Sequence, residues 1–288
     1  MNTKISGVGV ALITPFKKDK SIDFNALEYL LDFVTKGGVD FLVIMGTTAE
    51  NPVLDSEEKK HITTCVIERN AGKLPVVLGV GGNNTREAVK AVASLPEGVD
   101  AVLSITPYYN KPQQQGLVEH FSAVADASPK PLILYNVPGR TGVNMTADTC
   151  LRLAEHRNIV AVKEASGNLN QMGYILRGRP EEFSVLSGDD GLVLPQMAIG
   201  ADGIISVAAN AFPVQLCNLV HTAAKGDFKT AAALHLSLLE TFDLLFVEGN
   251  PTGIKAAVAL TGMIENELRL PLTPASESLI EKLKKAIK

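Results

Sequence analysis

The sequence predicts an α/β protein built as a (β/α)8 TIM barrel with a C-terminal helical extension. Eight short apolar runs recur along the first 210 residues, and a segment with helical periodicity follows each of them. The runs are apolar throughout rather than alternating, which is typical of parallel strands covered on both faces. Because right-handed crossovers leave few topologies for eight such units, we expect the strands to close into a barrel.

The expected strands, in chain order, are 7–14, 41–47, 75–82, 101–107, 131–138, 159–166, 183–190 and 203–210. The segments between them carry helix signals. In the first, Asp23 is a candidate N-cap before an apolar face, and Gly37 and Gly38 close the helix. From Thr14 to Ser206 the seven steps span 192 residues. That is about 27 residues per unit, which suits a compact (β/α)8 barrel.

The strand pattern stops near Pro213. The stretch 231–246 is strongly apolar and helical, and turn residues interrupt the chain at 249–251 and 271–274. We therefore divide the chain into a (β/α)8 barrel, residues 1–212, and a C-terminal helical domain, residues 213–288. A doubly wound open sheet is the alternative, but 79–82 lacks the third glycine of a dinucleotide fingerprint.

Composition excludes several classes of partner. Of the 288 residues 46% are hydrophobic, and the net charge of −4 comes without a dense Lys/Arg cluster, which argues against nucleic-acid binding. No apolar run approaches the ~18 residues that a membrane span needs. The cysteines, Cys65, Cys150 and Cys217, are odd in number and never spaced as C-x-x-C. We expect a soluble cytoplasmic protein that acts on a small molecule.

Chemically unusual residues follow several of the expected strands. In a (β/α)8 barrel the carboxyl ends of all strands meet at one rim, where active sites lie. We therefore expect these residues to converge there: Thr47, Thr48, Tyr108, Tyr109, Tyr135, Arg140, Lys163 and Gly188. Each has a structural alternative, such as helix capping for the threonines, interface packing for the tyrosines or a surface ion pair for the cations. Their joint occurrence at matching strand ends favours a site.

Lys163 is the candidate nucleophile. An amine attacks a carbonyl only in its neutral form, and burial at the mouth of an apolar barrel, with a nearby cation such as Arg140, favours that form. Tyrosine hydroxyls can relay the protons that imine formation moves. This combination indicates Schiff-base chemistry on a small carbonyl compound.

Other catalytic schemes lack their motifs. The five histidines fall in predicted helices and form no H-E-x-x-H, and neither G-x-S-x-G nor a P-loop occurs. Asp189 and Asp190 could be paired acids, but they precede a predicted helix, and we interpret them as N-cap residues. We expect no metal and no cofactor.

Five motifs occur along the chain in the following order: GTTAE (46–50), TPYYNKP (106–112), YNVPGRTG (135–142), KEASGN (163–168) and LSGDD (186–190). With them the chain closely resembles the dihydrodipicolinate synthase family, of the N-acetylneuraminate lyase superfamily, as far as LRLPLTP (268–274). The resemblance implies a class I aldolase that condenses pyruvate with L-aspartate 4-semialdehyde in lysine and diaminopimelate biosynthesis.

The resemblance also assigns roles. Lys163 would form the imine with pyruvate, and Tyr135 would shuttle protons. Thr47 would link Tyr135 to Tyr109, which in this family reaches in from a neighbouring subunit. Thr48 would bind the pyruvate carboxylate. A homotetramer, arranged as a dimer of dimers, is expected.

On the second substrate, Arg140 would position the carboxylate of the semialdehyde, while Gly188 and Ile205 would supply carbonyl oxygens. The sequence Arg140-Thr141-Gly142 favours the synthase over the related N-acetylneuraminate lyases, which lack it. A sugar-acid aldolase and a non-catalytic keto-acid-binding protein are the alternatives.

Some positions bear on regulation or depart from the family pattern. Asn83, Glu87 and Tyr108 match the family's allosteric lysine pocket, but Ser56 and Lys59 depart from the residues of sensitive members, so feedback inhibition stays open. Ala49 replaces a glycine, and Gly253 stands where a proline is more common.

Overall fold

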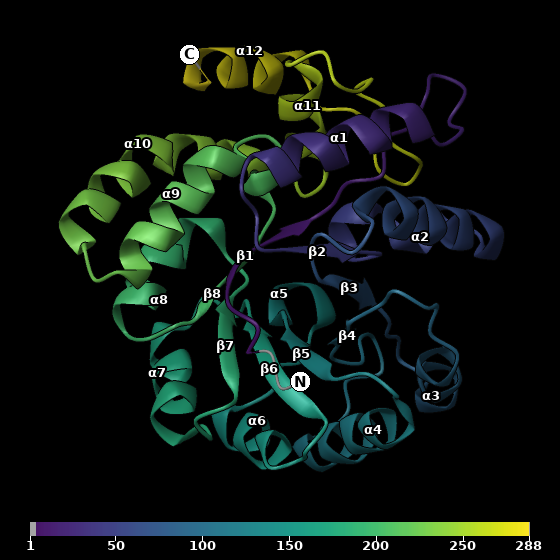
Figure 1. Cartoon of the computed structure of the whole chain (residues 1–288), viewed down its shortest axis with the longest axis vertical. Coiled ribbons are helices and arrows are strands. Elements are labelled where there is room, and N and C mark those ends of the chain that lie inside the picture. Colours follow the sequence, from purple (N-terminus) through teal and green to yellow (C-terminus); the bar gives the residue numbers. More distant parts are fainter. Residues whose placement is uncertain (1–3, 288) are drawn as a thin grey trace.

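In the computed structural model, which describes residues 4–287, eight parallel strands close into a barrel in sequence order (Figure 1). The strands are β1 (Gly7–Ala11), β2 (Phe41–Ile44), β3 (Val76–Gly79), β4 (Ala101–Ile105), β5 (Leu132–Asn136), β6 (Ile159–Glu164), β7 (Ser184–Ser187) and β8 (Gly203–Ser206). The pairing of β8 with β1, in which Ile205 lies opposite Gly9, completes the ring. The predicted fold is confirmed.

Helices surround the barrel. They are α1 (Phe24–Lys36), α2 (Ser56–Asn70), α3 (Thr85–Ala93), α4 (Gln114–Ala127), the short α5 (Pro138–Thr141), α6 (Ala147–Ala154), α7 (Leu169–Gly178), α8 (Val193–Ala198) and α9 (Pro213–Ala224). Four short 3-10 turns lie in three of the loops: η1 (Thr47–Ala49) and η2 (Asn51–Val53) after β2, η3 (Asp190–Leu192) after β7 and η4 (Ala208–Asn210) after β8. The capping predicted for the first helix is confirmed, since the Asp23 side chain accepts from the Ala26 N–H.

Two apolar cores form because successive side chains of a strand point to opposite faces. One core fills the space between the strands and the surrounding helices. The other fills the barrel interior and includes Ala11, Val43, Leu103, Tyr135, Ala161 and Ile205. A polar side chain directed inward at the carboxyl end of a strand therefore stands above an apolar floor.

Three further helices, α10 (Phe228–Phe246), α11 (Thr252–Ala259) and α12 (Glu277–Ala286), lie together on one side of the barrel (Figure 1). Helix α10 packs on α9, and α11 contacts η4 and α12. Gly253 lets α11 approach α10 closely, because a Cβ there would lie 2.3 Å from the Leu245 carbonyl oxygen. Since α9 packs on β1 and β8, it takes the position of the eighth barrel helix. The domain boundary at residue 212 stays a prediction.

No helix within residues 4–287 combines the length and the hydropathy that crossing a bilayer would require.

Candidate active site

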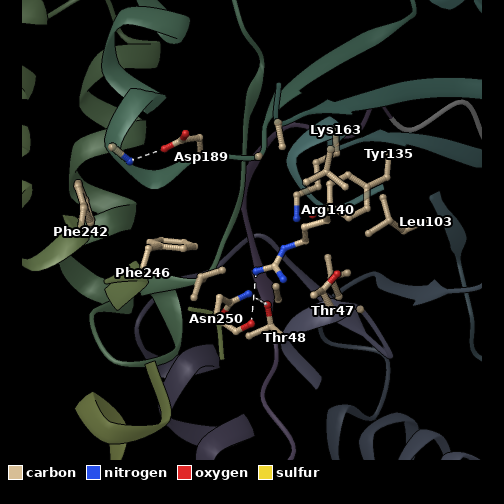
Figure 2. A pocket seen from close by; sticks show the side chains of 18 of the residues that line it. Thr47, Thr48, Leu103, Tyr135, Arg140, Lys163, Asp189, Phe242, Phe246 and Asn250 are labelled. Atoms are coloured by element: carbon tan, nitrogen blue, oxygen red, sulfur yellow. Dashed lines mark hydrogen bonds between the residues drawn. The ribbon is translucent and has the colours of Figure 1, made fainter. Parts of the chain in front are cut away.

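A cavity of about 610 Å³ opens at the carboxyl end of the strands and extends to α10 (Figure 2). Six of the residues predicted for the site line it: Thr47, Thr48, Tyr135, Arg140, Lys163 and Gly188. Residues from the C-terminal side, which the sequence did not point to, complete the wall: Phe242, Asp243, Phe246, Val247 and Asn250. The prediction that the strand-end residues converge is confirmed for these six.

Lys163 and Tyr135 form the centre of the cavity. They lie opposite each other on the paired strands β6 and β5. Lys163 Nζ is 4.3 Å from the centroid of the Tyr135 ring, and the two residues are only 6% and 7% exposed. The amine therefore stands at the cavity wall, beside the phenol and above the apolar interior of the barrel.

Gly188 leaves the space that the lysine side chain occupies. A Cβ at this position would lie 3.0 Å from Lys163 Cε and 2.5 Å from the Cβ of Ala165. Real contacts between carbon atoms are about 3.5–4.0 Å, so any side chain here would displace its neighbours. The glycine of LSGDD is thus required by the packing of Lys163.

The loop after β2 carries Thr47 and Thr48 in the turn η1. Left-handed residues flank this turn, Met45 with φ 56° and Glu50 with φ 56°. Ala49 is not among the residues with positive φ, so the replacement of the family's glycine does not strain the backbone there. Thr48 is 3% exposed, and its hydroxyl accepts a hydrogen bond from Asn250 Nδ2 at 3.0 Å.

Arg140 belongs to α5, which follows β5. Its Nη2 donates to the carbonyl oxygen of Asn250 at 3.3 Å. Asn250 therefore contacts both predicted carboxylate-binding residues, Thr48 and Arg140, from the segment that joins α10 to α11 (Figure 2). In the sequence Asn250 and Pro251 signalled only a helix break.

Strand β6 ends on a lysine and a glutamate because the two side chains serve opposite faces of the barrel wall. Lys163 lines the cavity, whereas Glu164 is buried on the helix side and 1% exposed. Its carboxylate accepts from Asn136 Nδ2 at 3.0 Å, from Gln171 Nε2 at 3.1 Å and from the Ser166 N–H at 2.7 Å. These donors satisfy a buried charge that would otherwise be costly. The carboxylate ties β5, β6 and α7 together behind the site.

The two aspartates after β7 have structural partners, but the predicted N-cap role is confirmed only for Asp189, because Asp190 is the first residue of η3 itself. Asp189 caps η3, since its side chain accepts from the Gly191 N–H at 3.0 Å. Asp190 is 1% exposed and accepts from the N–H groups of Val207 and Ala208, each at 3.1 Å. Burial raises the pKa of both carboxyl groups.

The remaining predicted residues do not reach this cavity. Tyr109 is 88% exposed, has φ 72° and does not line the cavity. Ile205 is buried inside the barrel. Asn83 Nδ2 donates to the Tyr108 carbonyl oxygen at 3.2 Å, and Glu87 forms an exposed ion pair with Lys90. The allosteric role of Asn83, Glu87 and Tyr108 stays a prediction.

Histidine and cysteine side chains take no part in the cavity lining. Four of the five histidines lie in helices, but His156 follows the end of α6, so the helix prediction is wrong for that residue. Burial lowers the pKa of His120 and of His235. In the described part of the chain no three His, Cys, Asp or Glu side chains are grouped so that they could hold a metal ion.

Comparison with known proteins agrees with this geometry. The model of the dihydrodipicolinate synthetase family matches residues 4–288. The chain belongs to this family. The 4-hydroxy-tetrahydrodipicolinate synthase of Parabacteroides distasonis is 51% identical over 286 residues, which cover 99% of this chain and 96% of the relative.

Among solved members, the crystal structure of dihydrodipicolinate synthase from Aquifex aeolicus superposes with a TM-score of 0.95 at 44% identity and covers 98% of this chain and 97% of its own. The chloride-inhibited synthase from Acinetobacter baumannii, complexed with pyruvate, gives a TM-score of 0.96 at 39% identity and covers 98% of each chain. The family predicted from the five motifs is confirmed.

Proposed function

We propose that this chain catalyses the 4-hydroxy-tetrahydrodipicolinate synthase reaction, the condensation of pyruvate with L-aspartate 4-semialdehyde. The observation that carries the proposal is the buried amine of Lys163, held 4.3 Å from the Tyr135 ring in a cavity at the barrel rim. Full-length relatives at about half identity carry the name of this activity. An amine so placed meets a carbonyl substrate without competition from bulk water.

The chemistry begins with attack of Lys163 Nζ on C2 of pyruvate. Loss of water leaves a protonated imine, and removal of a proton from the methyl carbon then gives an enamine. The enamine carbon attacks the aldehyde carbon of the semialdehyde, forming the new C–C bond while the imine returns. Attack of the substrate's own amine on the imine carbon closes the ring and releases Lys163. We assign to Tyr135 the donation and acceptance of the protons in these steps, because the centroid of its phenol ring lies 4.3 Å from the amine.

Each of the two substrates carries a carboxylate that the enzyme must hold in place during the reaction. We assign the pyruvate carboxylate to Thr48 on the loop after β2, and the semialdehyde carboxylate to the guanidinium of Arg140 through charge-assisted hydrogen bonds. Asn250 supports both assignments because it contacts both residues. We assign the role of a carbonyl oxygen at the site to Gly188, which lines the cavity, whereas the carbonyl role expected of Ile205 has no support from the cavity lining.

Borohydride reduction in the presence of pyruvate, followed by mass spectrometry of peptides, tests the imine. We expect a pyruvate-derived adduct on Lys163 and none in the matched Lys163→Met variant. An unmodified Lys163 would leave a keto-acid-binding protein and refute the proposal. Condensation assays with aspartate semialdehyde, run beside cleavage assays with sialic and deoxy-gluconic acids, distinguish the synthase from a sugar-acid aldolase.

We propose further that Tyr109 completes the site of a neighbouring subunit in a homotetramer, a dimer of dimers, linked to Tyr135 through Thr47. Its 88% exposure and its absence from the cavity of its own chain support this placement. Mixing the variants Tyr109→Phe and Lys163→Met tests it. Mixed dimers would contain one site with both native residues, so activity should rise above that of either variant alone. Activity that is simply additive would refute subunit sharing.

A further inference from the structure

A buried ion pair joins the C-terminal region to the loop that carries Thr48. Lys255 Nζ of α11 lies 2.5 Å from Glu50 Oε1, and neither side chain is exposed. The ammonium also donates to the carbonyl oxygen of Glu267 at 2.7 Å and stands 4.1 Å from the centroid of the Phe16 ring. The other carboxylate oxygen of Glu50 accepts from the Arg269 N–H at 3.0 Å. Glu50 is thus held by two residues of the C-terminal region.

Stability alone does not account for such a pair. Desolvating two charges costs about as much as their attraction returns, and apolar residues of similar volume often replace a buried pair without loss. A buried pair does fix geometry, because neither group can move without leaving the other charge unpaired. The position of this pair therefore matters more than its energy.

Glu50 lies so close in the chain to Thr48 that a shift of its backbone would displace the part of the loop that lines the cavity. It is the left-handed residue that ends η1, two residues after Thr48. The same loop is fastened elsewhere by Asn51 Nδ2, which donates to the Met45 carbonyl oxygen at 2.9 Å, and by Thr14 Oγ1, which donates to the Ala49 carbonyl oxygen at 2.7 Å. Two contacts reach this loop from the C-terminal region: the ion pair at Glu50, and Asn250 Nδ2, which donates to the Thr48 hydroxyl at 3.0 Å.

We propose that Lys255 is a positioning residue, which acts through Glu50 to hold the loop 46–50 where Thr48 can bind the keto-acid carboxylate. The inference rests on the proposed function, since it assumes that this loop receives pyruvate. The C-terminal region is then part of the substrate site, although Lys255 itself does not line the cavity.

Lys255→Met and Glu50→Gln test the pair, each in the full-length chain. The pyruvate concentration that gives half-maximal borohydride trapping on Lys163, here called pyruvate half-saturation, should rise about tenfold. This corresponds to a loss of about 1.4 kcal/mol of binding free energy. The maximal extent of trapping and the KM for the semialdehyde should stay within about threefold, less than 1 kcal/mol. Equal rises for both substrates, or none for pyruvate, would overturn the proposal. Failure of the unmodified chain to trap pyruvate would instead refute the proposed function.

Single variants leave one buried charge unpaired and can fail to fold, so the double variant Glu50→Gln/Lys255→Met decides the question. Removing both charges together should restore the melting temperature, because a neutral pair has no unpaired charge to bury. Pyruvate half-saturation should nevertheless stay raised about tenfold. A double variant with normal pyruvate affinity would show that the pair is structural only.

A matched control breaks a different contact at the same boundary. Arg269 Nη1 donates to Glu58 Oε2 at 2.7 Å, and Glu58 lies on α2, outside the loop 46–50. Glu58→Gln should lower the melting temperature slightly and leave pyruvate half-saturation unchanged. A rise equal to that of Lys255→Met would show that any weakening of this boundary has the same effect, and would overturn a specific role for Lys255.

Hydrogen exchange in the unmodified protein gives an answer that does not depend on how the variants fold. If the pair couples the loop to the C-terminal region, pyruvate should protect peptides that span 46–50 and 264–270, but not those of α12. Unchanged exchange at 264–270 would overturn the proposal.

Discussion

Gly188→Ala is expected to disable the enzyme with little loss of fold. The added methyl group would lie 2.5 Å from Ala165 Cβ and 3.0 Å from Lys163 Cε, both shorter than the ~3.5–4.0 Å of ordinary carbon contacts. The deficit at Lys163 Cε is roughly 0.5–1 Å, and the flexible lysine side chain, with Nζ, should move by about that distance. The larger deficit at Ala165 Cβ, roughly 1–1.5 Å, must be taken up by the chain after β6.

A displacement of about 1 Å at a reacting atom can cost on the order of 100-fold in rate. Inserting one methyl group into a packed site destabilises a protein by about 1–3 kcal/mol. We therefore expect kcat/KM to fall about 100-fold, equivalent to about 2.7 kcal/mol of transition-state stabilisation. The drop in melting temperature should be a few degrees, as ~1 kcal/mol shifts a large domain by about 2–4 °C.

A coupled assay of condensation measures kcat/KM, and borohydride trapping measures imine formation separately. Gly173→Ala on α7 is the matched control, because a Cβ there would meet no atom within 4 Å. It should leave both readouts unchanged. Activity of Gly188→Ala within threefold of the unmodified enzyme would refute the view that this glycine makes room for Lys163.

Three further outcomes follow from the contacts around the cavity. Arg140→Ala should lower kcat/KM for the semialdehyde by about 10- to 100-fold, the loss of one charge-assisted interaction, and leave pyruvate trapping nearly intact; equal losses would contradict its role. Tyr135→Phe should slow imine formation by at least about 100-fold in stopped-flow trapping, since it removes a proton donor, and a smaller effect would assign the relay elsewhere. Burial lowers the pKa of Lys255 to about 8, with Glu50 opposing the shift. Below pH 8 the ammonium is present and the pair intact, and above pH 8 the unmodified enzyme loses that charge. We therefore compare pyruvate half-saturation in Lys255→Met with that in the unmodified chain, and expect the ratio of the two values to fall toward 1 between pH 7 and 9. A ratio that stays constant over this range would show that the charge of Lys255 has no role.

The environment of Lys255 indicates which other groups bear on that pH dependence. The charged groups around it are Glu50, which raises its pKa, and Lys20 and Arg269, which lower it. Glu267 contributes its carbonyl oxygen to Lys255 while its carboxylate binds Lys20. Salt should change the profile only weakly because the central pair is buried.

The barrel and most of its rim could be predicted from the sequence because a closed parallel sheet relates position in the chain directly to position in space. Every strand ends at the same rim, so residues such as Thr47, Tyr135 and Lys163, far apart in sequence, were expected together and line one cavity. Their motifs also identified the family.

Contacts outside the strand-helix repeat could not be found in this way. Asn250 meets Thr48 across 202 residues, and Lys255 meets Glu50 across 205, and no periodic pattern relates positions on the C-terminal helices to positions on the rim. Nor does a single residue pattern show that Gly188 makes room for a lysine on the neighbouring strand. The sequence by itself determined the fold class and the family and predicted the position of the candidate nucleophile, because these depend on local pattern and on the symmetry of the barrel. Only the tertiary structure decided which side chains hold Lys163 and the loops around the cavity in place, because packing between distant segments is set by the whole fold.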